Sequence, residues 1–303
     1  MKIAVIGVGL IGGSLAIDIR ARGLAKEIIG VDFNPFHQQE ALRLGLVDRI
    51  MELPNAASSV DLILLATPVS TLPDLAVQVL DLCSDTCVVM DTGSTKQQVC
   101  RAVSGHAKRS QFVAAHPIAG TENSGPEAAI PGLFNGKTNI ICEREKSAAV
   151  AIERAMELFN SFGMKTIFME PLEHDRHAAY VSHLSHVSSF LLGQTVLDME
   201  KDEKNIFNLA GSGFASTVRL AKSSPQMWAP IFEQNVEFLS QALLEYIMNL
   251  QRFHYHLMKR DTTELLRIMS QANDIRRVLD GIELKQSSVR NSETSKDVTT
   301  KIQ

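Results

Sequence analysis

Residues 3–15 read IAVIGVGLIGGSL, and this stretch decides the fold class of the 303-residue chain. It opens with an apolar, β-branched run from Ile3 to Ile6, which is typical of a buried strand. Glycines follow at Gly7, Gly9 and Gly12, where the backbone can turn sharply, approach another group closely and pack a helix on the strand. The stretch therefore predicts a strand, a tight turn and the start of a helix.

The same glycines have the spacing Gly-x-Gly-x-x-Gly, which marks a dinucleotide site when a strand precedes it and a helix follows. The first N–H groups of that helix have no partner in the helix itself, and with the helix dipole they favour an anion such as a pyrophosphate. We expect the cofactor to contact Gly7, Gly9, Leu10, Ile11 and Gly12. The alternative is a glycine-rich turn in an α/β protein that binds no nucleotide.

A second apolar run, from Ile28 to Val31, leads to Asp32. A carboxylate at this position accepts hydrogen bonds from the ribose hydroxyls of NAD and repels the 2′-phosphate of NADP. Residues 33–35 are Phe-Asn-Pro, so no Lys or Arg follows directly to bind that phosphate. The sequence predicts NAD as the cofactor.

Short apolar runs alternate with helical patterns up to about residue 170, as in a βαβ chain. Because runs that are apolar on both faces suit parallel strands covered by helices, we predict an α/β fold with a Rossmann-type, doubly wound, mostly parallel sheet. The expected strands are Ile3 to Ile6, Ile28 to Val31, Leu62 to Ala66, Cys87 to Asp91, Phe112 to Ala115, Asn139 to Cys142 and Thr166 to Met169. The expected helices are Gly12 to Arg22, Pro35 to Leu44, Val69 to Leu82, Thr95 to Val103 and Ser147 to Phe162.

Beyond Pro171 the pattern is helical throughout, over residues 174–198, 207–220, 225–250 and 261–279. We predict an NAD-binding domain at residues 1–170, an all-helical domain for substrate binding and dimerisation at 171–283, and a flexible polar tail at 284–303. The broad apolar faces of the helical domain favour a homodimer, since symmetric pairs are the commonest oligomers.

The composition excludes several classes of protein. The 30 Lys and Arg against 34 Asp and Glu leave a formal net charge of −4, without the basic excess common in nucleic-acid-binding proteins. No segment stays apolar for the roughly 20 residues that a membrane span needs. The 4 cysteines contain no C-x-x-C pair, so neither a zinc knuckle nor a disulfide framework is indicated. We expect a cytoplasmic protein that contacts neither nucleic acid nor membrane.

Three polar turns follow strands at the carboxyl edge of the predicted sheet, where a nicotinamide would lie. They are Ala66-Thr67-Pro68, residues 91–96 (DTGSTK) and residues 116–122 (HPIAGTE). We expect Thr67 and Pro68 to contact the cofactor, and both also suit the N-cap and first residue of a helix. The imidazole of His116 can accept the proton of a substrate hydroxyl while hydride leaves the same carbon. Its alternative role is a structural hydrogen bond at the end of a strand.

Six motifs, in this order, resemble the prephenate/arogenate dehydrogenase family of tyrosine biosynthesis. They are Gly7-x-Gly9-x-x-Gly12, Asp91-x-Gly-Ser94-x-Lys96, His116-Pro-Ile-Ala-Gly-Thr-Glu122, His174-Asp175, Ser182-His183-Leu-Ser-His186 and Gly213-Phe-x-x-x-x-Arg219-x-Ala-x-x-x-Pro225-x-x-Trp228. The resemblance extends from residue 1 to about residue 250. It implies an enzyme that oxidises and decarboxylates prephenate with NAD to give 4-hydroxyphenylpyruvate.

The resemblance also implies roles for individual residues. His116 would be catalytic and polarise the C4 hydroxyl, while Ser94 would help to hold this histidine and the ring end of the substrate. Arg219 would bind a substrate carboxylate, which its forked guanidinium can meet with two hydrogen bonds. The pocket would be completed by His186, with Thr121 and Glu122 near its mouth.

Four histidines have a spacing that helical zinc ligands also show, namely His174, His177, His183 and His186. No matched carboxylate or cysteine set completes such a site, and hydride transfer to NAD needs no metal. We therefore expect no metal.

Other functions are compatible with parts of the pattern. An arogenate dehydrogenase, or a cyclohexadienyl dehydrogenase that accepts both substrates, would use the same chemistry, and Asp32 slightly favours prephenate because its users more often prefer NAD. A β-hydroxyacid dehydrogenase or imine reductase also joins a Rossmann domain to helices. A catalytically silent NAD-binding regulator is the alternative that is not an enzyme.

Overall fold

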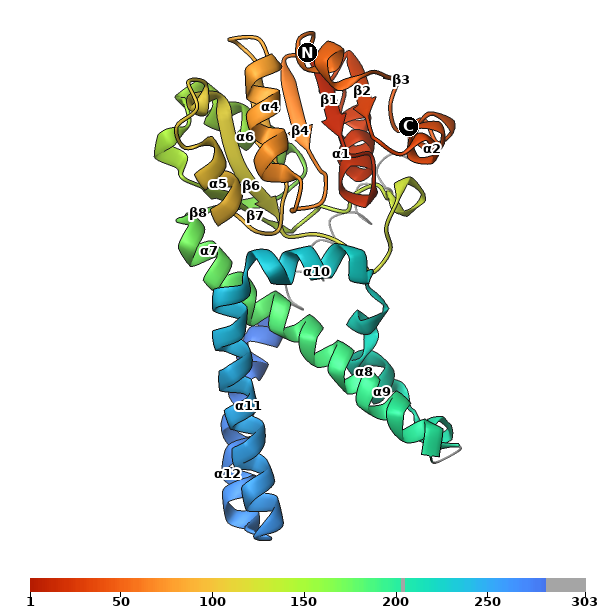
Figure 1. The fold of residues 1–303 in the computed structure, drawn as a ribbon, viewed down its shortest axis with the longest axis vertical. Helices are drawn as coiled ribbons and strands as arrows, with labels where there is room; N and C mark the ends of the chain where they lie inside the picture. The colour runs from red at the N-terminus through yellow and green to blue at the C-terminus, as the bar shows by residue number, and fades with distance from the viewer. Residues whose placement is uncertain (203–204, 282–303) are drawn as a thin grey trace, which may run out of the picture. The chain divides into compact units, whose positions relative to one another are not determined.

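The computed structural model of the chain describes residues 1–202 and 205–281 (Figure 1). By its internal contacts the chain divides into two compact units, Met1–Leu239 and Ser240–Gln303. The first unit contains the sheet and all the predicted site residues. The predicted tail at 284–303 lies outside the described residues.

An eight-stranded sheet lies at the centre of the first unit, with the strand order β3-β2-β1-β4-β5-β6-β7-β8 (Figure 1). Its strands are β1 (Lys2–Ile6), β2 (Glu27–Val31), β3 (Arg49–Ile50), β4 (Leu62–Leu65), β5 (Val88–Asp91), β6 (Phe112–Pro117), β7 (Thr138–Cys142) and β8 (Lys165–Met169). Strands β1 to β6 are parallel, whereas β7 runs antiparallel to β6 and carries β8 parallel to itself. The predicted doubly wound, mostly parallel sheet is confirmed, and the short β3 is an addition to it.

The strand order reverses at β1, which pairs with β2 on one side and with β4 on the other. In open parallel sheets, ligands bind beyond the carboxyl ends of the strands at such a reversal. The glycine turn follows β1 and the Ala66-Thr67-Pro68 turn follows β4, so the topology brings both turns to this point.

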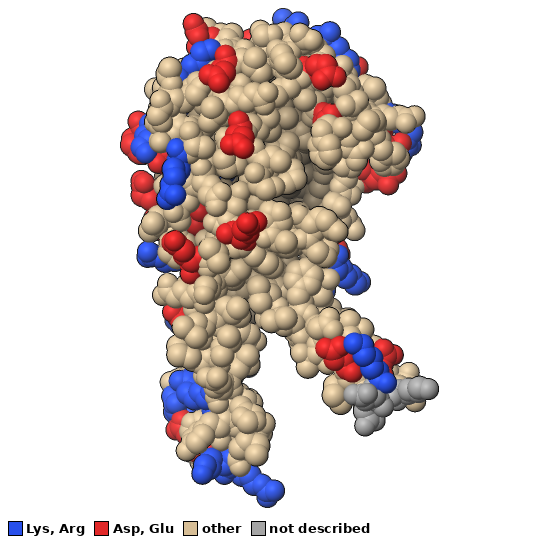
Figure 2. Space-filling view, viewed as in Figure 1, with Lys and Arg blue, Asp and Glu red and all other residues tan. Residues whose placement is uncertain are grey.

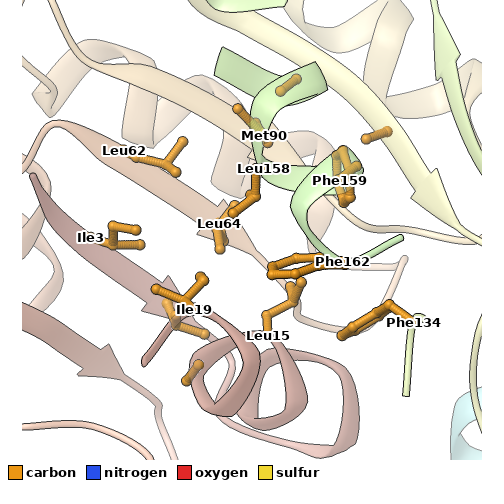
Figure 3. Close-up of a cluster of buried hydrophobic side chains, with 14 of the residues drawn as sticks. Ile3, Leu15, Ile19, Leu62, Leu64, Met90, Phe134, Leu158, Phe159 and Phe162 are labelled. Atoms are coloured by element: carbon orange, nitrogen blue, oxygen red, sulfur yellow. The ribbon is translucent and has the colours of Figure 1, made fainter. Parts of the chain in front are cut away.

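Helices cover both faces of the sheet. On one face lie α1 (Leu10–Ala21) and α6 (Ala149–Ser161), and on the other lie α3 (Leu53–Ala57), α4 (Leu72–Leu82) and α5 (Gln97–Val103), while α2 (Pro35–Arg43) follows β2. Figure 3 shows the first core, in which Ile3 and Leu64 of the sheet meet Leu15 of α1 and Phe159 of α6. Because successive strand residues point to opposite faces, Ala4 joins the second core.

The helix after β4 differs from its prediction. It begins at Leu72, with Thr71 as its N-cap, and not at Val69 or at Thr67. Thr67 and Pro68 instead form a loop, in which the Thr67 hydroxyl accepts a hydrogen bond from Thr71 Oγ1 at 2.9 Å. The proposal that these two residues start a helix is wrong, and they remain at the edge of the sheet.

The helical region starts directly after β8. It contains α7 (Pro171–Ala178), a π-helical turn (Ala179–His183), α8 (Leu184–Asp202), α9 (Ser212–Thr217), α10 (Pro225–Gln234), α11 (Val236–Met258) and α12 (Thr262–Ala272). The single helix predicted over 207–220 is wrong: a 3₁₀ turn precedes α9, and a second 3₁₀ turn begins at Arg219. Two glycines flank the start of α9, and glycine is a poor helix former.

The single helix predicted over 225–250 is also wrong, because the chain leaves the helical path at Asn235. The side-chain amide of Asn235 donates to the carbonyl oxygen of Asp175 at 2.7 Å and to His183 Nδ1 at 3.1 Å. These tertiary hydrogen bonds hold Asn235 between α10 and α11, and helix propensity alone could not reveal them.

Apolar side chains remain exposed along α11, among them Leu244, Ile247, Met248, Leu250 and Leu257. On the face shown in Figure 2, acidic and basic side chains are scattered among uncharged ones. Within residues 1–202 and 205–281, no helix has the length and apolar character needed to cross a membrane. The 4 cysteines are free and buried.

Candidate active site

The glycine turn shows which of its glycines the fold itself requires. Gly7 has φ +89°, and a Cβ there would lie 2.6 Å from the carbonyl oxygen of Ala66. A Cβ on Gly12 would lie 2.0 Å from the carbonyl oxygen of Gly7. At Gly9, in contrast, the nearest atom to a Cβ would be the amide nitrogen of Gly125, at 4.0 Å. The chain's own packing does not explain Gly9, so the turn keeps open space at the N-terminus of α1.

This open space fits a dinucleotide. Gly9 is the N-cap of the 12-residue helix α1, no side chain caps it, and no acidic residue lies in the first turn. The free N–H groups and the positive end of the helix dipole are therefore available to a pyrophosphate. Leu10 and Ile11, which begin the helix, are both partly exposed, as expected for residues beside a bound cofactor.

Asp32 lies directly after β2 and reaches back to the glycine turn. Its carboxylate accepts hydrogen bonds from the backbone N–H of Val8 and of Asn34, both at 3.0 Å, and His37 Nδ1 lies 3.5 Å from it. Since an ionised carboxylate offers about four acceptor positions, capacity remains for ribose hydroxyls. Asp32 therefore fixes the turn as well as presenting a negative charge.

The loop between β6 and β7, which carries Thr121 and Glu122, is attached to α1. The N–H of Ile130 donates to Ser14 Oγ at 3.0 Å, and the N–H of Gly132 donates to Asp18 Oδ1 at 2.9 Å. The helix that follows the glycine turn thus also positions this loop.

A chain of hydrogen bonds leads from the sheet into the helical region. His116 is the fifth residue of β6, and its Nδ1 lies 2.8 Å from Nε2 of His174 on α7. His174 Nδ1 lies 2.7 Å from Oδ1 of Asp175. His174 and Asp175 are each 1% exposed, whereas His116 is only half-buried. The loss of solvent around the ring, and then the nearby His174, Lys96 and His183, hold the pKa of His116 well below its usual value.

A buried ion pair lies beside this chain of hydrogen bonds and contacts the strand that carries His116. Lys96 pairs with Asp91 at the end of β5, and Lys96 Nζ also donates to the carbonyl oxygen of Ala115 at 2.7 Å. The carboxylate of Asp91 accepts from the N–H of Gly93 at 2.9 Å and from the N–H of Ala115 at 3.2 Å. Because Ala115 precedes His116, this pair fixes the backbone that carries the histidine. Lys96 belongs to the motif at residues 91–96, but the sequence pattern alone predicts no role for it.

Ser94 is partly exposed in the turn after β5. In the part of the chain that the structure describes, its hydroxyl makes no hydrogen bond to His116, and His174 holds the imidazole instead. The role in which Ser94 helps to hold this histidine therefore has no contact to support it, while its position at the carboxyl edge suits contact with a ligand.

A second group of predicted residues gathers around Trp228. The ring of His186 stacks on Trp228 with centroids 3.5 Å apart, and His186 Nδ1 lies 2.9 Å from the carbonyl oxygen of Ser182, to which it donates. Burial, and to a smaller extent the charge of Arg219, lowers the pKa of His186. Arg219 Nη1 lies 3.4 Å from Glu122 Oε2. These contacts join the loop after β6 to the helical region, and Trp228 itself is packed in the second core.

Thr121 lies beside Glu122 and is half-buried. Its hydroxyl accepts a hydrogen bond from the N–H of Asn123 at 3.2 Å, which shapes the loop. Over the described ranges, no group of three or more His, Cys, Asp or Glu could hold a metal ion.

Comparison with known families assigns both halves of the chain. The nucleotide-binding domain of prephenate dehydrogenase matches residues 15–168, and the dimerization domain of prephenate dehydrogenase matches residues 170–271. The chain belongs to the prephenate dehydrogenase family. The family that the six motifs resemble is thereby confirmed.

Individual members of the prephenate dehydrogenase family agree with this assignment. The chain is 31% identical to the prephenate dehydrogenase of Bacillus subtilis, over 92% of this chain and 76% of the relative. It is 29% identical to the cyclohexadienyl dehydrogenase of Zymomonas mobilis, over 91% of this chain and 95% of the relative. Among solved structures, Aquifex aeolicus prephenate dehydrogenase in complex with hydroxyphenyl propionate and NAD⁺ superposes with a TM-score of 0.85 at 30% identity, covering 92% of this chain and 98% of that one.

Proposed function

We propose that the chain is an NAD-dependent prephenate dehydrogenase, which converts prephenate to 4-hydroxyphenylpyruvate and CO₂. The observation that carries this function is the neutral, hydrogen-bonded His116 at the carboxyl edge of the sheet that also bears the glycine turn. Family membership and the NAD⁺ complex of the Aquifex enzyme support both the reaction and the cofactor.

The cofactor would be held by the turn after β1, by Asp32 and by the loop after β4. The free N–H groups of Leu10, Ile11 and Gly12 would bind the pyrophosphate, and the open space at Gly9 lets it approach. The ribose hydroxyls would donate to Asp32, while Thr67 and Pro68 would border the nicotinamide end. When bound, NAD supplies the acceptor for the hydride.

The reaction removes the C4 hydrogen of the ring as hydride and breaks the bond between the ring and its carboxylate. The electron pair of that bond completes the aromatic ring, CO₂ leaves, and the C4 hydroxyl becomes a phenol. His116 acts on this hydroxyl: its Nε2 accepts the O–H hydrogen bond and draws the proton closer as positive charge develops at C4. The proton that Nε2 draws toward itself in the transition state returns to the phenol oxygen of the product, so all atoms and charges balance.

The substrate carboxylates would be bound on the side of the helical region. Arg219 is 55% exposed at its side chain and its contact with Glu122 is 3.4 Å, so the guanidinium can exchange this partner for a carboxylate. His186 donates from Nδ1 to the carbonyl oxygen of Ser182 and is neutral, which leaves its Nε2 unprotonated and able to accept a hydrogen bond. Thr121 and Ser94 would line the pocket from the sheet side.

The domain roles follow the same proposal. Residues 1–170 would bind NAD, and residues 171–283 would complete the substrate pocket and form a homodimer. The match to a dimerization domain and the exposed apolar side chains of α11 support the homodimer. Light scattering on the purified chain should give twice the monomer mass, and a monomer would contradict the assignment.

A second candidate is a cyclohexadienyl dehydrogenase that also oxidises arogenate, and the Zymomonas relative favours it. NADH formation should be followed by its absorbance, with prephenate and arogenate offered separately, each with NAD and with NADP. Turnover of prephenate with NAD is the expected result. Comparable turnover of both substrates would favour the second candidate, and no turnover with either would refute both.

A further inference from the structure

We propose that His174 and Asp175 are positioning residues, which hold His116 in the tautomer whose Nε2 is free to accept the substrate proton. The proposal rests on the proposed function only for the identity of that proton. The hydrogen-bond chain itself belongs to the folded protein and can be measured without a substrate.

The direction of each hydrogen bond follows from Asp175. Its carboxylate accepts from the backbone N–H of Lys96 at 2.8 Å, from that of Gln97 at 2.9 Å, and from His174 at 2.7 Å. An ionised carboxylate can only accept, so His174 must carry its proton on Nδ1. Asp175 is thereby fixed by the start of α5 while it orients the histidine beside it.

The second step follows from the state of His174. Burial is the main cause that lowers the pKa of His174, so its imidazole is neutral and its Nε2 bears a lone pair. His116 Nδ1 faces that lone pair at 2.8 Å and must donate to it. A neutral His116 with its proton on Nδ1 leaves Nε2 unprotonated, which is the state that a proton acceptor requires.

The surroundings maintain this arrangement. The charged and titratable groups that face the two imidazoles are Lys96 and Asp91 from the sheet side, Asp175 from α7 and His183 from the π-helical turn. Because burial, and to a smaller extent His174, Lys96 and His183, disfavour a positive charge on His116, the free enzyme keeps this imidazole neutral. When His116 takes up a share of the substrate proton, the Nδ1–H bond to His174 strengthens, since hydrogen bonds from a charged donor are stronger.

The structure offers a matched set of variants. His174→Phe keeps a planar ring but removes the acceptor, whereas His174→Gln retains an amide oxygen that can accept from His116 Nδ1. His177 lies on the same helix, is exposed and provides the control variant His177→Phe. A correctly placed proton acceptor contributes about 10²- to 10⁴-fold to a rate, so the loss of its orienting partner should fall in this range.

The tautomer should be measured first, by ¹⁵N NMR of the histidine-labelled free protein at neutral pH, with His116→Asn to assign the signals. We expect His116 to carry its proton on Nδ1. A proton on Nε2 in the wild-type protein would overturn the proposal whatever the enzyme's activity. This measurement stays decisive if prephenate proves not to be the substrate, and it needs no His174 variant to fold.

Kinetics should follow. We expect His174→Phe to lower kcat at least about 10²-fold with little change in the KM for prephenate, His174→Gln to recover much of the loss, and His177→Phe to match the wild type. Wild-type turnover by His174→Phe would overturn the proposal. Equal losses in the Phe and Gln variants, with the His116 tautomer unchanged in both, would also overturn it, because His174 would then be structural only.

Discussion

His116 must be unprotonated to accept a proton, and its surroundings determine the pH at which this holds. Burial is the largest cause of its lowered pKa, and His174, Lys96 and His183 lower the pKa further. Since the reactive form lies above this pKa, kcat/KM should stay high as the pH falls through 6.5, the usual value for histidine, and decrease only at lower pH.

The substitution that tests this is His116→Asn, whose amide cannot take up a proton. We expect kcat to fall about 10²- to 10⁴-fold, the KM for prephenate to change little, and the decrease on the acid side to disappear. The measurement is a pH profile of initial rates for both proteins. An Asn variant that retains the wild-type rate would show that another group accepts the proton.

Arg219 presents a different kind of contact, because a carboxylate clamp holds the substrate before and during the reaction. Arg219→Gln should therefore raise the KM for prephenate by roughly 10- to 100-fold, with a smaller effect on kcat, as expected for the loss of a charged hydrogen bond of about 1.5–3 kcal/mol. Glu122→Gln is the comparison variant, since it removes the negative charge 3.4 Å from Arg219 but keeps the guanidinium. If Arg219→Gln left KM unaltered, the carboxylate would be bound elsewhere.

At the scale of single elements, the turn between β1 and α1 separates what the fold needs from what a ligand needs. A Cβ on Gly12 would overlap the carbonyl oxygen of Gly7 at 2.0 Å, whereas a Cβ on Gly9 would approach no atom closer than 4.0 Å. Gly9 also has an extended backbone, with φ −94° and ψ −153°, which alanine can adopt. The two glycines, three residues apart, should therefore respond differently to substitution.

We expect Gly12→Ala to lower the free energy of unfolding by about 1–3 kcal/mol or more, since overpacking usually costs this much. Gly9→Ala should leave the free energy of unfolding nearly unchanged and weaken NAD binding at least about tenfold, since the new methyl group occupies the space for the pyrophosphate. Denaturant unfolding and calorimetric titration with NAD measure the two effects. Full NAD affinity in Gly9→Ala would mean that the cofactor does not approach this turn.

The turn between β1 and α1 also shows which parts of the site can be predicted from the sequence. Gly7, Gly12 and Asp32 could be predicted because strand, turn and helix are neighbours in sequence and their chemistry is local. The sequence shows His174 only as part of a motif, because its partner His116 is 58 residues away and only the folded chain brings them together. The sequence cannot predict the break at Asn235 for the same reason: its hydrogen bonds to Asp175 and His183 are tertiary.

At the scale of the whole molecule, the buried and half-buried histidines link the active site to stability. Burial lowers the pKa of His183 to about 4, and the pKa values of His116, His174 and His186 are lowered as well. In the unfolded chain each would titrate near 6.5. As the pH falls below about 6.5, these histidines take up protons in the unfolded chain but not yet in the folded protein. The stability that they contribute above about pH 6.5 is therefore lost as the pH falls toward their pKa values in the folded protein.

For His183 alone, which is 1% exposed, the loss would approach about 3 kcal/mol near pH 4. We therefore expect the free energy of unfolding to fall between about pH 7.5 and about pH 5, before most carboxyl groups titrate. Denaturant unfolding at several pH values measures this, and His183→Gln is the matched control because it keeps a polar partner for Asn235 but cannot titrate. The variant should show a shallower pH dependence than the wild type. Equal free energies of unfolding of the wild type at about pH 7.5 and about pH 5 would mean that the folded protein takes up protons on these histidines as readily as the unfolded chain does. The neutral state of His174 and His116, on which the direction of their hydrogen bond depends, would then be contradicted.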